Sequence, residues 1–420
     1  MPSEAIQLST LPNGVRVVSE TASHVQSLSL GLWVDAGSVD EPAGVRGISH
    51  FIEHMLFKGT EKRNAQQIAE AIESRGGSLN AFTDKECTCF YVKSLAEDAE
   101  VAMDVLSDML LASRLDPGEL ALERNVVLEE IKRYEDTPDD IIHDVFTQTL
   151  WKRHPLGRPV LGTARTVAEL DDVAVRAYLA ENYTPDRMVV AAAGNVPHER
   201  IVELASQMLG GHAGASKRKS RKPPHVSRLS KSVWKRTEQV HFCLGGDGAG
   251  QHDVRRFPLT ILDMVLGGNM SSRLFQEIRE KRGLAYSIGS YLTVFQDCGY
   301  FTVYGGTSPD TYDQVLELVH AELAKVRQEG LTPDEVAKAK NQVRGSLILG
   351  LEGMSARMMR LGKSILSFGY VPSLDEFAKR INAVTLEDVQ QVAAAGLDPD
   401  GLTTTAIGPF ARLAAAEEAA

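Results

Sequence analysis

Apolar and polar residues alternate along the chain with two periods, which predict strands and helices in turn. Short β-rich or alternating stretches predict strands over Val15–Ser19, Ser27–Val34, Leu79–Ser94 and Met188–Ala193. Apolar positions at helical spacing predict helices over Ala65–Ser74, Ala99–Ala112 and Glu119–Tyr134. This order of elements predicts an α+β domain in which helices pack on a mixed or antiparallel sheet.

The two halves of the chain carry the same landmarks in the same order. The motif Leu115-Asp116-Pro117 recurs as Leu331-Thr332-Pro333, 216 positions later, and each copy precedes a predicted helix. Near the end of each half, Pro185 and Pro399 lie 214 positions apart, and each is followed by a short strand-like run and a glycine. The sequence therefore predicts two homologous domains of one α+β fold.

A basic stretch separates the two copies. From Lys217 to Arg236 the chain carries nine Lys or Arg residues, no acid and the pair Pro223-Pro224, which is typical of a solvated linker. We therefore expect an N-terminal domain over 1–212, a linker over 213–235 and a C-terminal domain over 236–420. The linker has Trp234 as its one aromatic residue, so we do not expect nucleic-acid binding.

Composition narrows the class of protein further. The 420 residues are 43% hydrophobic and carry 45 Lys+Arg against 56 Asp+Glu, a formal net charge of −11, as is usual for a globular protein. The longest apolar run, Met188–Ala193, is far shorter than the roughly 18 residues of a membrane helix, so we expect no membrane partner. No leader-like segment precedes the first strand, and we expect a bacterial cytoplasmic location.

Candidate chemistry lies in the stretch Ser49–Leu56. His50 and His54 are four residues apart, so both imidazoles leave one face of a helix, as a pair of metal ligands would. Glu53 lies between them, within reach of water at such a metal, which is the position that a general base requires. Taken alone, the pattern could also be an ordinary surface or core feature. Imidazole pairs favour zinc, and the spacing His-x-x-Glu-His is the inverzincin motif.

A second acidic segment decides between these alternatives. The run Glu123–Ile131 places Glu130 76 residues after His54. With this spacing the chain resembles the pitrilysin family of metallopeptidases, in particular the short-chain branch that includes mitochondrial processing peptidase and its bacterial relatives. The resemblance implies that Glu130 is the third zinc ligand and that Glu123, seven residues earlier, supports the site from outside. Glu129 lies about 100° around the helix from Glu130 and is expected to face elsewhere.

Two further segments resemble parts of this family that contact substrate. Gly76–Thr83 is similar to the edge strand along which an extended peptide is bound, which implies substrate contacts at Asn80, Ala81 and Phe82. The alternative is a turn that leads into an ordinary sheet strand.

In the second copy, Leu274–Tyr286 resembles the segment whose arginine and tyrosine reach the substrate, here Arg279 and Tyr286. A guanidinium can hold a peptide carbonyl, and a phenol can donate to a developing oxyanion. The alternative is an amphipathic surface helix followed by a core tyrosine.

The repeat predicts that only one copy binds metal. An offset of 216 places Ser346 opposite Glu130 and Ala339 opposite Glu123. The stretch that corresponds to the histidine helix, Arg256–Gly267, contains no histidine. The second copy is therefore expected to supply wall and substrate contacts.

The resemblance implies a zinc endopeptidase with one zinc ion per chain, acting on peptide substrates in a chamber formed by two chains. We expect a homodimer, with a heterodimer containing an inactive paralogue as the other possibility. The acidic balance would suit basic peptides, although such acidic stretches are usually solvated surface. The alternative function is that of a non-catalytic scaffold or assembly subunit of the same family.

Overall fold

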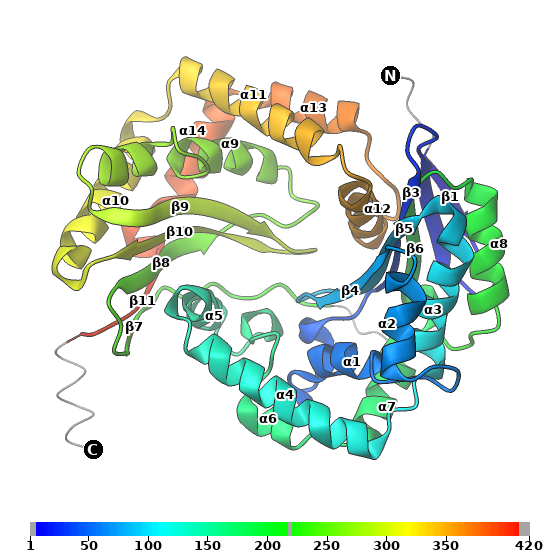
Figure 1. The fold of residues 1–420 in the computed structure, drawn as a ribbon. Coiled ribbons are helices and arrows are strands. Elements are labelled where there is room, and N and C mark those ends of the chain that lie inside the picture. Colours follow the sequence, from blue (N-terminus) through cyan, green and yellow to red (C-terminus); the bar gives the residue numbers. More distant parts are fainter. Residues whose placement is uncertain (1–5, 217–220, 411–420) are drawn as a thin grey trace. The chain divides into compact units, whose positions relative to one another are not determined.

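The computed structural model describes residues 6–216 and 221–410, which form two compact units (Figure 1). The first unit comprises Met1–Lys132, Pro159–Ser220 and Leu349–Pro372, and the second comprises Arg133–Arg158, Arg221–Ile348 and Ser373–Ala420. Each unit has its own sheet and its own hydrophobic core. Within the described ranges, no helix combines the length and the apolarity that a membrane crossing needs.

The sheet of the first unit has the strand order β1-β2-β6-β3-β5-β4. Its strands are β1 (Ile6–Thr10), β2 (Arg16–Thr21), β3 (Ser27–Val34), β4 (Ser78–Thr83), β5 (Thr88–Leu95) and β6 (Met188–Gly194). β2 and β6 are parallel, and the other neighbours are antiparallel. The predicted strand over Leu79–Ser94 is in fact the hairpin of β4 and β5, because Asp84–Cys87 forms the turn between them.

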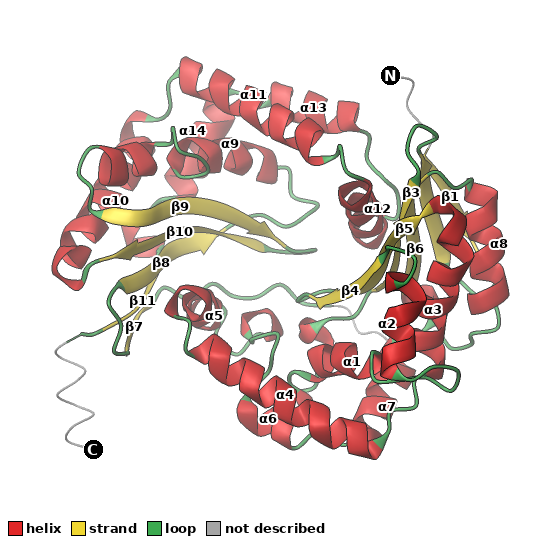
Figure 2. Ribbon diagram, viewed as in Figure 1, coloured by secondary structure: helices red, strands yellow, loops and turns green. Residues whose placement is uncertain are grey.

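Helices cover both faces of this sheet (Figure 2). They are α1 (Ile48–Leu56), α2 (Ala65–Glu73), α3 (Ala99–Ala112), α4 (Pro117–Glu135), α6 (Ala164–Ala168), α7 (Asp172–Asn182), α8 (His198–Leu209) and α12 (Met354–Phe368). Strand alternation divides the core, because Leu32 joins the large cluster that also contains residues of α1 and α3, whereas Trp33 joins a second cluster with α12.

The second unit repeats this design. Its strands are β7 (Ser230–Trp234), β8 (Val240–Asp247), β9 (Ala285–Val294), β10 (Gly299–Thr307) and β11 (Thr403–Gly408), in the order β7-β11-β8-β10-β9. Its helices are α5 (Pro138–Leu150), α9 (Arg256–Leu266), α10 (Tyr312–Glu329), α11 (Pro333–Gly350), α13 (Leu374–Ala383) and α14 (Leu386–Gly396), with a π-helical turn, η6 (Phe275–Glu280).

Strand order confirms the predicted repeat and the α+β class. If β7 is set against β2, the order β7-β11-β8-β10-β9 reproduces β2-β6-β3-β5-β4. The first two strands are parallel in both sheets, β7 with β11 and β2 with β6. β1 is an addition to the first sheet. Each unit is thus a mixed sheet with helices packed on it.

The two copies exchange one helix each. α5 belongs to the first half of the sequence but packs on β11 and β8 of the second unit. Its counterpart α12, which begins 216 positions later, packs on β6, β3 and β2 of the first unit. The boundaries 1–212, 213–235 and 236–420 remain a prediction for the repeat, and the compact units differ from them because of this exchange.

The basic segment between the copies differs from a simple linker. Residues 217–220 lie outside the described ranges. Ser230–Trp234 forms β7, which pairs in parallel with β11 at the edge of the second sheet. Alternation of Lys231 and Val233 with small residues was the available sign of this strand, and the surrounding positive charge obscured it.

Candidate metal centre

The histidine helix α1 is fixed by its apolar side and by its first turn. Phe51, Ile52 and Met55 are fully buried in the core of the first unit. At the N-terminus, the buried carboxylate of Glu41 accepts hydrogen bonds from the backbone N–H groups of Gly47 (2.8 Å) and Ser49 (2.9 Å). A negative group at this end accepts hydrogen bonds from N–H groups that have no partner inside the helix, and its charge interacts favourably with the helix dipole.

His50 and His54 project from α1 toward Glu130 of α4. Oε2 of Glu130 lies 3.7 Å from Nε2 of His50 and 3.5 Å from Nε2 of His54. These three residues form the one cluster of potential metal ligands found among the described residues, with ligand atoms within 4.8 Å of one another. Bonds of about 2.0–2.1 Å in a tetrahedral zinc site place ligand atoms about 3.4 Å apart, so the donor set fits a zinc ion.

Glu123 occupies the same helix two turns before Glu130. Leu120, Val127 and Ile131 bury the core side of α4, and the Glu123 carboxylate is itself only 5% exposed. Its Oε1 accepts a hydrogen bond from Nδ1 of His54 at 2.8 Å. Once the ring of His54 is neutral, Nδ1 as the donor leaves Nε2 unprotonated and available to a metal.

Lys58 is a second partner of the Glu123 carboxylate, in addition to His54. Its Nζ lies 2.6 Å from Oε2 of Glu123, so the carboxylate bridges an ammonium and an imidazole. Burial acts to raise the pKa of Glu123, but hydrogen bonds from His54 and Lys58 outweigh it and lower that pKa. Glu123 is therefore ionised and holds the ring of His54 in one orientation.

The two histidines have opposite protonation preferences in the chain without metal. Burial lowers the pKa of His50 to about 4, with His54 acting in the same direction. Burial would also lower the pKa of His54, but its hydrogen bonds to Glu123 and Glu130 raise it to about 9. His50 is thus a ready neutral ligand at pH 7, whereas His54 must release a proton when a metal binds.

Glu53 lies on α1 between the two histidines and faces β4. Its Oε2 accepts a hydrogen bond of 2.5 Å from Oγ1 of Thr83. Burial raises the pKa of Glu53, and the Thr83 hydrogen bond acts against this rise. The charges of His54 and Glu130 also reach Glu53, which places its carboxylate beside the ligand cluster.

The predicted substrate strand is an edge strand. β4 lies at the end of the first sheet and pairs with β5 on one side. Asn80 is exposed, Ala81 is partly buried, and the ring of Phe82 lies 5.5 Å from that of Trp33 in an edge-to-face arrangement. An edge strand presents backbone groups that a further strand can pair with.

The second unit brings Arg279 and Tyr286 together. Arg279 Nη1 donates to the backbone carbonyl of Tyr286 at 2.9 Å, and the guanidinium lies 4.9 Å from the centre of the Tyr286 ring. The ring of Tyr286 is not a core group, since this residue is 78% exposed. At the positions that correspond to Glu130 and Glu123, the second unit has Ser346 and Ala339, and α9 carries no histidine.

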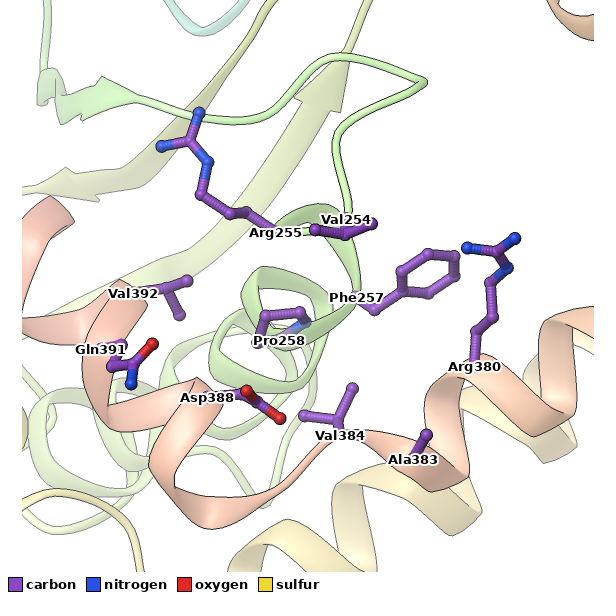
Figure 3. Close-up of a pocket in the computed structure, with 10 residues that line it drawn as sticks. All are labelled: Val254, Arg255, Phe257, Pro258, Arg380, Ala383, Val384, Asp388, Gln391 and Val392. Atoms are coloured by element: carbon purple, nitrogen blue, oxygen red, sulfur yellow. The ribbon is translucent and has the colours of Figure 1, made fainter.

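A cavity of about 340 Å³ in the second unit does not involve these residues. It lies between α9, α13 and α14, with Phe257, Pro258 and Val384 among its lining side chains (Figure 3). Two arginines at its rim form ion pairs within the unit, Arg255 with Asp253 and Arg380 with Glu376. Both arginines of this cavity are thus paired with carboxylates of the same unit, and we do not include the cavity in the candidate metal centre.

No sequence pattern indicates three residues that contact this site, namely Glu41, Lys58 and Thr83. Each acts on a residue of another element or across a loop, so no spacing within one helix could connect them. Thr83 offered the best clue, because it ends the same strand as Asn80–Phe82. Sequence position alone does not show which side chain it touches.

The structure is thus a repeated α+β domain in which one copy carries a His-His-Glu cluster that could hold a metal ion. Residues 16–164 match the family model for insulinase, peptidase family M16, and residues 172–343 match the model for the peptidase M16 inactive domain. The chain belongs to this family, which is also the pitrilysin family, and the resemblance found in the sequence is confirmed. His50, Glu53, His54, Glu123 and Glu130 all lie in the part that matches the insulinase model.

Bacterial relatives agree with this assignment. The chain is 44% identical over 386 residues to the uncharacterized zinc protease YmxG of Bacillus subtilis, with 91% of this chain and 94% of the relative covered. An uncharacterized zinc protease of Streptomyces coelicolor is 44% identical over 397 residues, with 92% and 86% covered.

Two crystal structures share the fold, each with a TM-score of 0.90 and 21% identity. They are a protease from Helicobacter pylori, with 97% of this chain and 100% of that chain covered, and a peptidase M16 inactive domain from Pseudomonas fluorescens, with 97% and 98% covered.

Proposed function

We propose that the protein is a zinc-dependent endopeptidase that cleaves peptides or unfolded segments. The observation that carries the proposal is the convergence of Nε2 of His50, Nε2 of His54 and a Glu130 carboxylate oxygen, with Glu53 beside them. The names of the bacterial relatives, zinc proteases, support the same conclusion.

His50, His54 and Glu130 would hold the ion. A bound zinc ion supplies a Lewis acid that polarises a peptide carbonyl and makes water more acidic. Glu53 takes the proton from the attacking water and passes it to the leaving amine, for which its raised pKa is suited. Glu123, ionised and paired with Lys58, keeps the ring of His54 in its ligating orientation.

Substrate would bind as an added strand along β4, next to Asn80, Ala81 and Phe82. Arg279 would hold a peptide carbonyl, and Tyr286 would donate a hydrogen bond to the developing oxyanion. We further propose that two copies pair into a homodimeric chamber and that basic peptides are favoured. A mass measurement in solution tests the pairing.

The proposal predicts cleavage that depends on zinc and on Glu53. A mixed peptide library incubated with the purified chain should show cuts that a chelator abolishes and added zinc restores, mapped by mass spectrometry. Glu53→Gln keeps the size of the side chain but cannot accept the proton, so we expect bound zinc at the wild-type stoichiometry and at least about a hundredfold slower cleavage. A Glu53→Gln variant as active as the wild type would remove Glu53 from this role.

The scaffold alternative has one observation in its favour. Residues 172–343 match a domain model described as inactive. That match includes none of the three candidate ligands, so an inactive second copy is compatible with a metal site in the first. A chain that binds zinc, stays folded and cleaves nothing in the library would support the scaffold function instead.

A further inference from the structure

Thr83 connects the candidate substrate strand with the candidate general base. It is the last residue of β4, the edge strand of the first sheet. Its hydroxyl donates to Oε2 of Glu53 on α1 at 2.5 Å, a short distance typical of a hydroxyl bonded to a carboxylate. This hydrogen bond links β4 to Glu53 through their side chains.

The direction of the Thr83 side chain follows from strand alternation. Thr83 lies on the same face of β4 as Leu79 and Ala81, both of which pack against the large core of the first unit. The neighbouring residue Phe82 points to the other face, where it meets Trp33. The last position of β4 is therefore the one from which a short side chain meets α1.

An oriented carboxylate is what a general base needs. A free glutamate has several rotamers, and restricting them to one costs up to about 2 kcal/mol in conformational entropy. A hydrogen bond to a fixed partner offsets this cost before substrate arrives. The Thr83 hydroxyl holds one oxygen, Oε2, and leaves Oε1 for proton transfer. Thr83 belongs to the strand that carries Asn80–Phe82, so the same strand positions both the general base and the bound substrate.

We propose that Thr83 is a positioning residue that orients Glu53 and ties the base to the substrate strand. This inference rests on the proposed peptidase function. Thr83 acts through Glu53, so its removal should slow the catalytic step and leave zinc binding and peptide binding unchanged.

The chain provides a matched control on the next strand. Thr88 is the ladder partner of Thr83 in the β4–β5 hairpin. Its Oγ1 donates to the backbone carbonyl of Ala36 at 2.9 Å, and Thr88 is fully buried. Thr88→Val therefore removes a hydroxyl from the same pair of strands at an equal or larger structural cost, without removing the hydrogen bond to Glu53.

The test compares Thr83→Val, Thr83→Ser and Thr88→Val in the full-length zinc-loaded chain. The substrate is a quenched fluorescent peptide that contains a site cleaved in the library. We expect Thr83→Val to lower kcat about tenfold to a hundredfold with KM within about twofold of the wild type, because general base catalysis is partly lost. Thr83→Ser keeps a hydroxyl and should recover most of kcat, and Thr88→Val should keep kcat while losing thermal stability.

Each outcome bears on one idea. A kcat for Thr83→Val equal to that of Thr88→Val in an active enzyme overturns the role of Thr83 but not the peptidase function. If Thr83→Val does not fold, Thr83→Ala and Thr83→Ser replace it, and equal kcat values in that pair overturn the role. A wild-type chain that cleaves no peptide removes the peptidase function, and the role of Thr83 with it.

Binding provides a second readout that is independent of turnover. In a Glu53→Gln background, the same peptide should bind with equal affinity whether residue 83 is Thr or Val, as measured by fluorescence anisotropy. A large loss of affinity on Thr83→Val would show that Thr83 serves substrate binding rather than the base, and would overturn the proposal.

Discussion

At the scale of single residues, the two histidines of the candidate metal centre differ in one hydrogen bond, that of the ring nitrogen Nδ1. Nδ1 of His54 donates to Glu123, and Glu123 in turn pairs with Lys58, so this ring is held by charge on the side away from Nε2. Nδ1 of His50 is buried and makes no hydrogen bond within the described residues. His50 is therefore positioned by packing on α1, whereas His54 is positioned by a carboxylate.

A buried carboxyl group in the second unit makes stability depend on pH. Asp263 of α9 accepts a hydrogen bond from Ser290 at 2.6 Å, and burial raises the pKa of Asp263 from its ordinary value of 3.8 to about 6. The folded state thus binds the proton more tightly than the unfolded state, and stability falls as pH rises from about 4 to about 6. At 1.36 kcal/mol per pKa unit, the cost is roughly 2–3 kcal/mol above pH 6.

Asp263→Asn removes this cost because the amide stays neutral. We expect the variant to be more stable than the wild type at pH 8 by up to roughly 2–3 kcal/mol, with the difference shrinking below pH 6 and vanishing near pH 4. Urea unfolding at the two pH values measures it. Asp310→Asn at an exposed position is the control and should change stability by less than about 0.5 kcal/mol. Equal stability of Asp263→Asn and wild type at pH 8 would contradict this account.

The sequence was sufficient to predict the candidate ligands and the supporting Glu123, but not Thr83 and Lys58. His50 and His54 share a helix, and Glu130 has the spacing of a known family, so a linear pattern contains all three. Thr83 and Lys58 matter only through contacts across elements, which depend on how α1 and the residues after it pack against β4 and α4. Such partners cannot be derived from spacing, because many Thr and Lys residues have equivalent sequence surroundings.

At the scale of elements, the close packing of α12 on the first sheet depends on two glycines, Gly31 and Gly362. A Cβ at Gly362 would overlap the fully buried indole of Trp33, and a Cβ at Gly31 would overlap the sulfur of Met358. Ion pairing adds to the fit, since Arg357 of α12 pairs with Glu20 of β2 at 2.7 Å. The helix can approach the sheet closely only because glycine occupies both positions.

Gly362→Ala tests this contact. The new methyl group gains helix propensity but overlaps Trp33, and overpacking of a buried site costs about 1–3 kcal/mol, so we expect a lower thermal midpoint. Gly345→Ala in α11 is the matched control, because a Cβ there meets nothing within 4 Å and should stabilise by about 0.4–1 kcal/mol. Equal midpoints for the two variants would show that α12 does not pack closely on Trp33.

At the scale of the whole molecule, the repeat was predictable and the exchange of helices was not. The landmarks at Pro185 and Pro399 identify equivalent ends of two domains, and the strand order confirms them. The periodic patterns of α5 and α12 show an apolar face but not which sheet covers it. Since both sheets present the same kind of surface, the choice depends on three-dimensional packing that no local pattern encodes.

The exchange predicts that the first half of the sequence cannot fold by itself. A fragment of residues 1–212 lacks α12, whose side chains Met354, Met358, Leu361 and Ile365 are buried on the first sheet. Each buried side chain of this size contributes about 1.5–3 kcal/mol, so together they approach the whole stability of a domain, about 5–15 kcal/mol. The same fragment also contains α5 without the sheet that covers it.

We therefore expect fragment 1–212 to melt without a cooperative transition, as followed by circular dichroism, and a peptide of residues 349–372 added in trans to restore one. A control peptide with Leu361→Asp should not, because it would bury a charge at a position that is fully buried. A cooperative melt of fragment 1–212 alone would show that the first sheet does not need α12. Since the candidate ligands all lie in this fragment, zinc binding should return together with the cooperative transition, which would make the metal centre depend on a helix from the other copy.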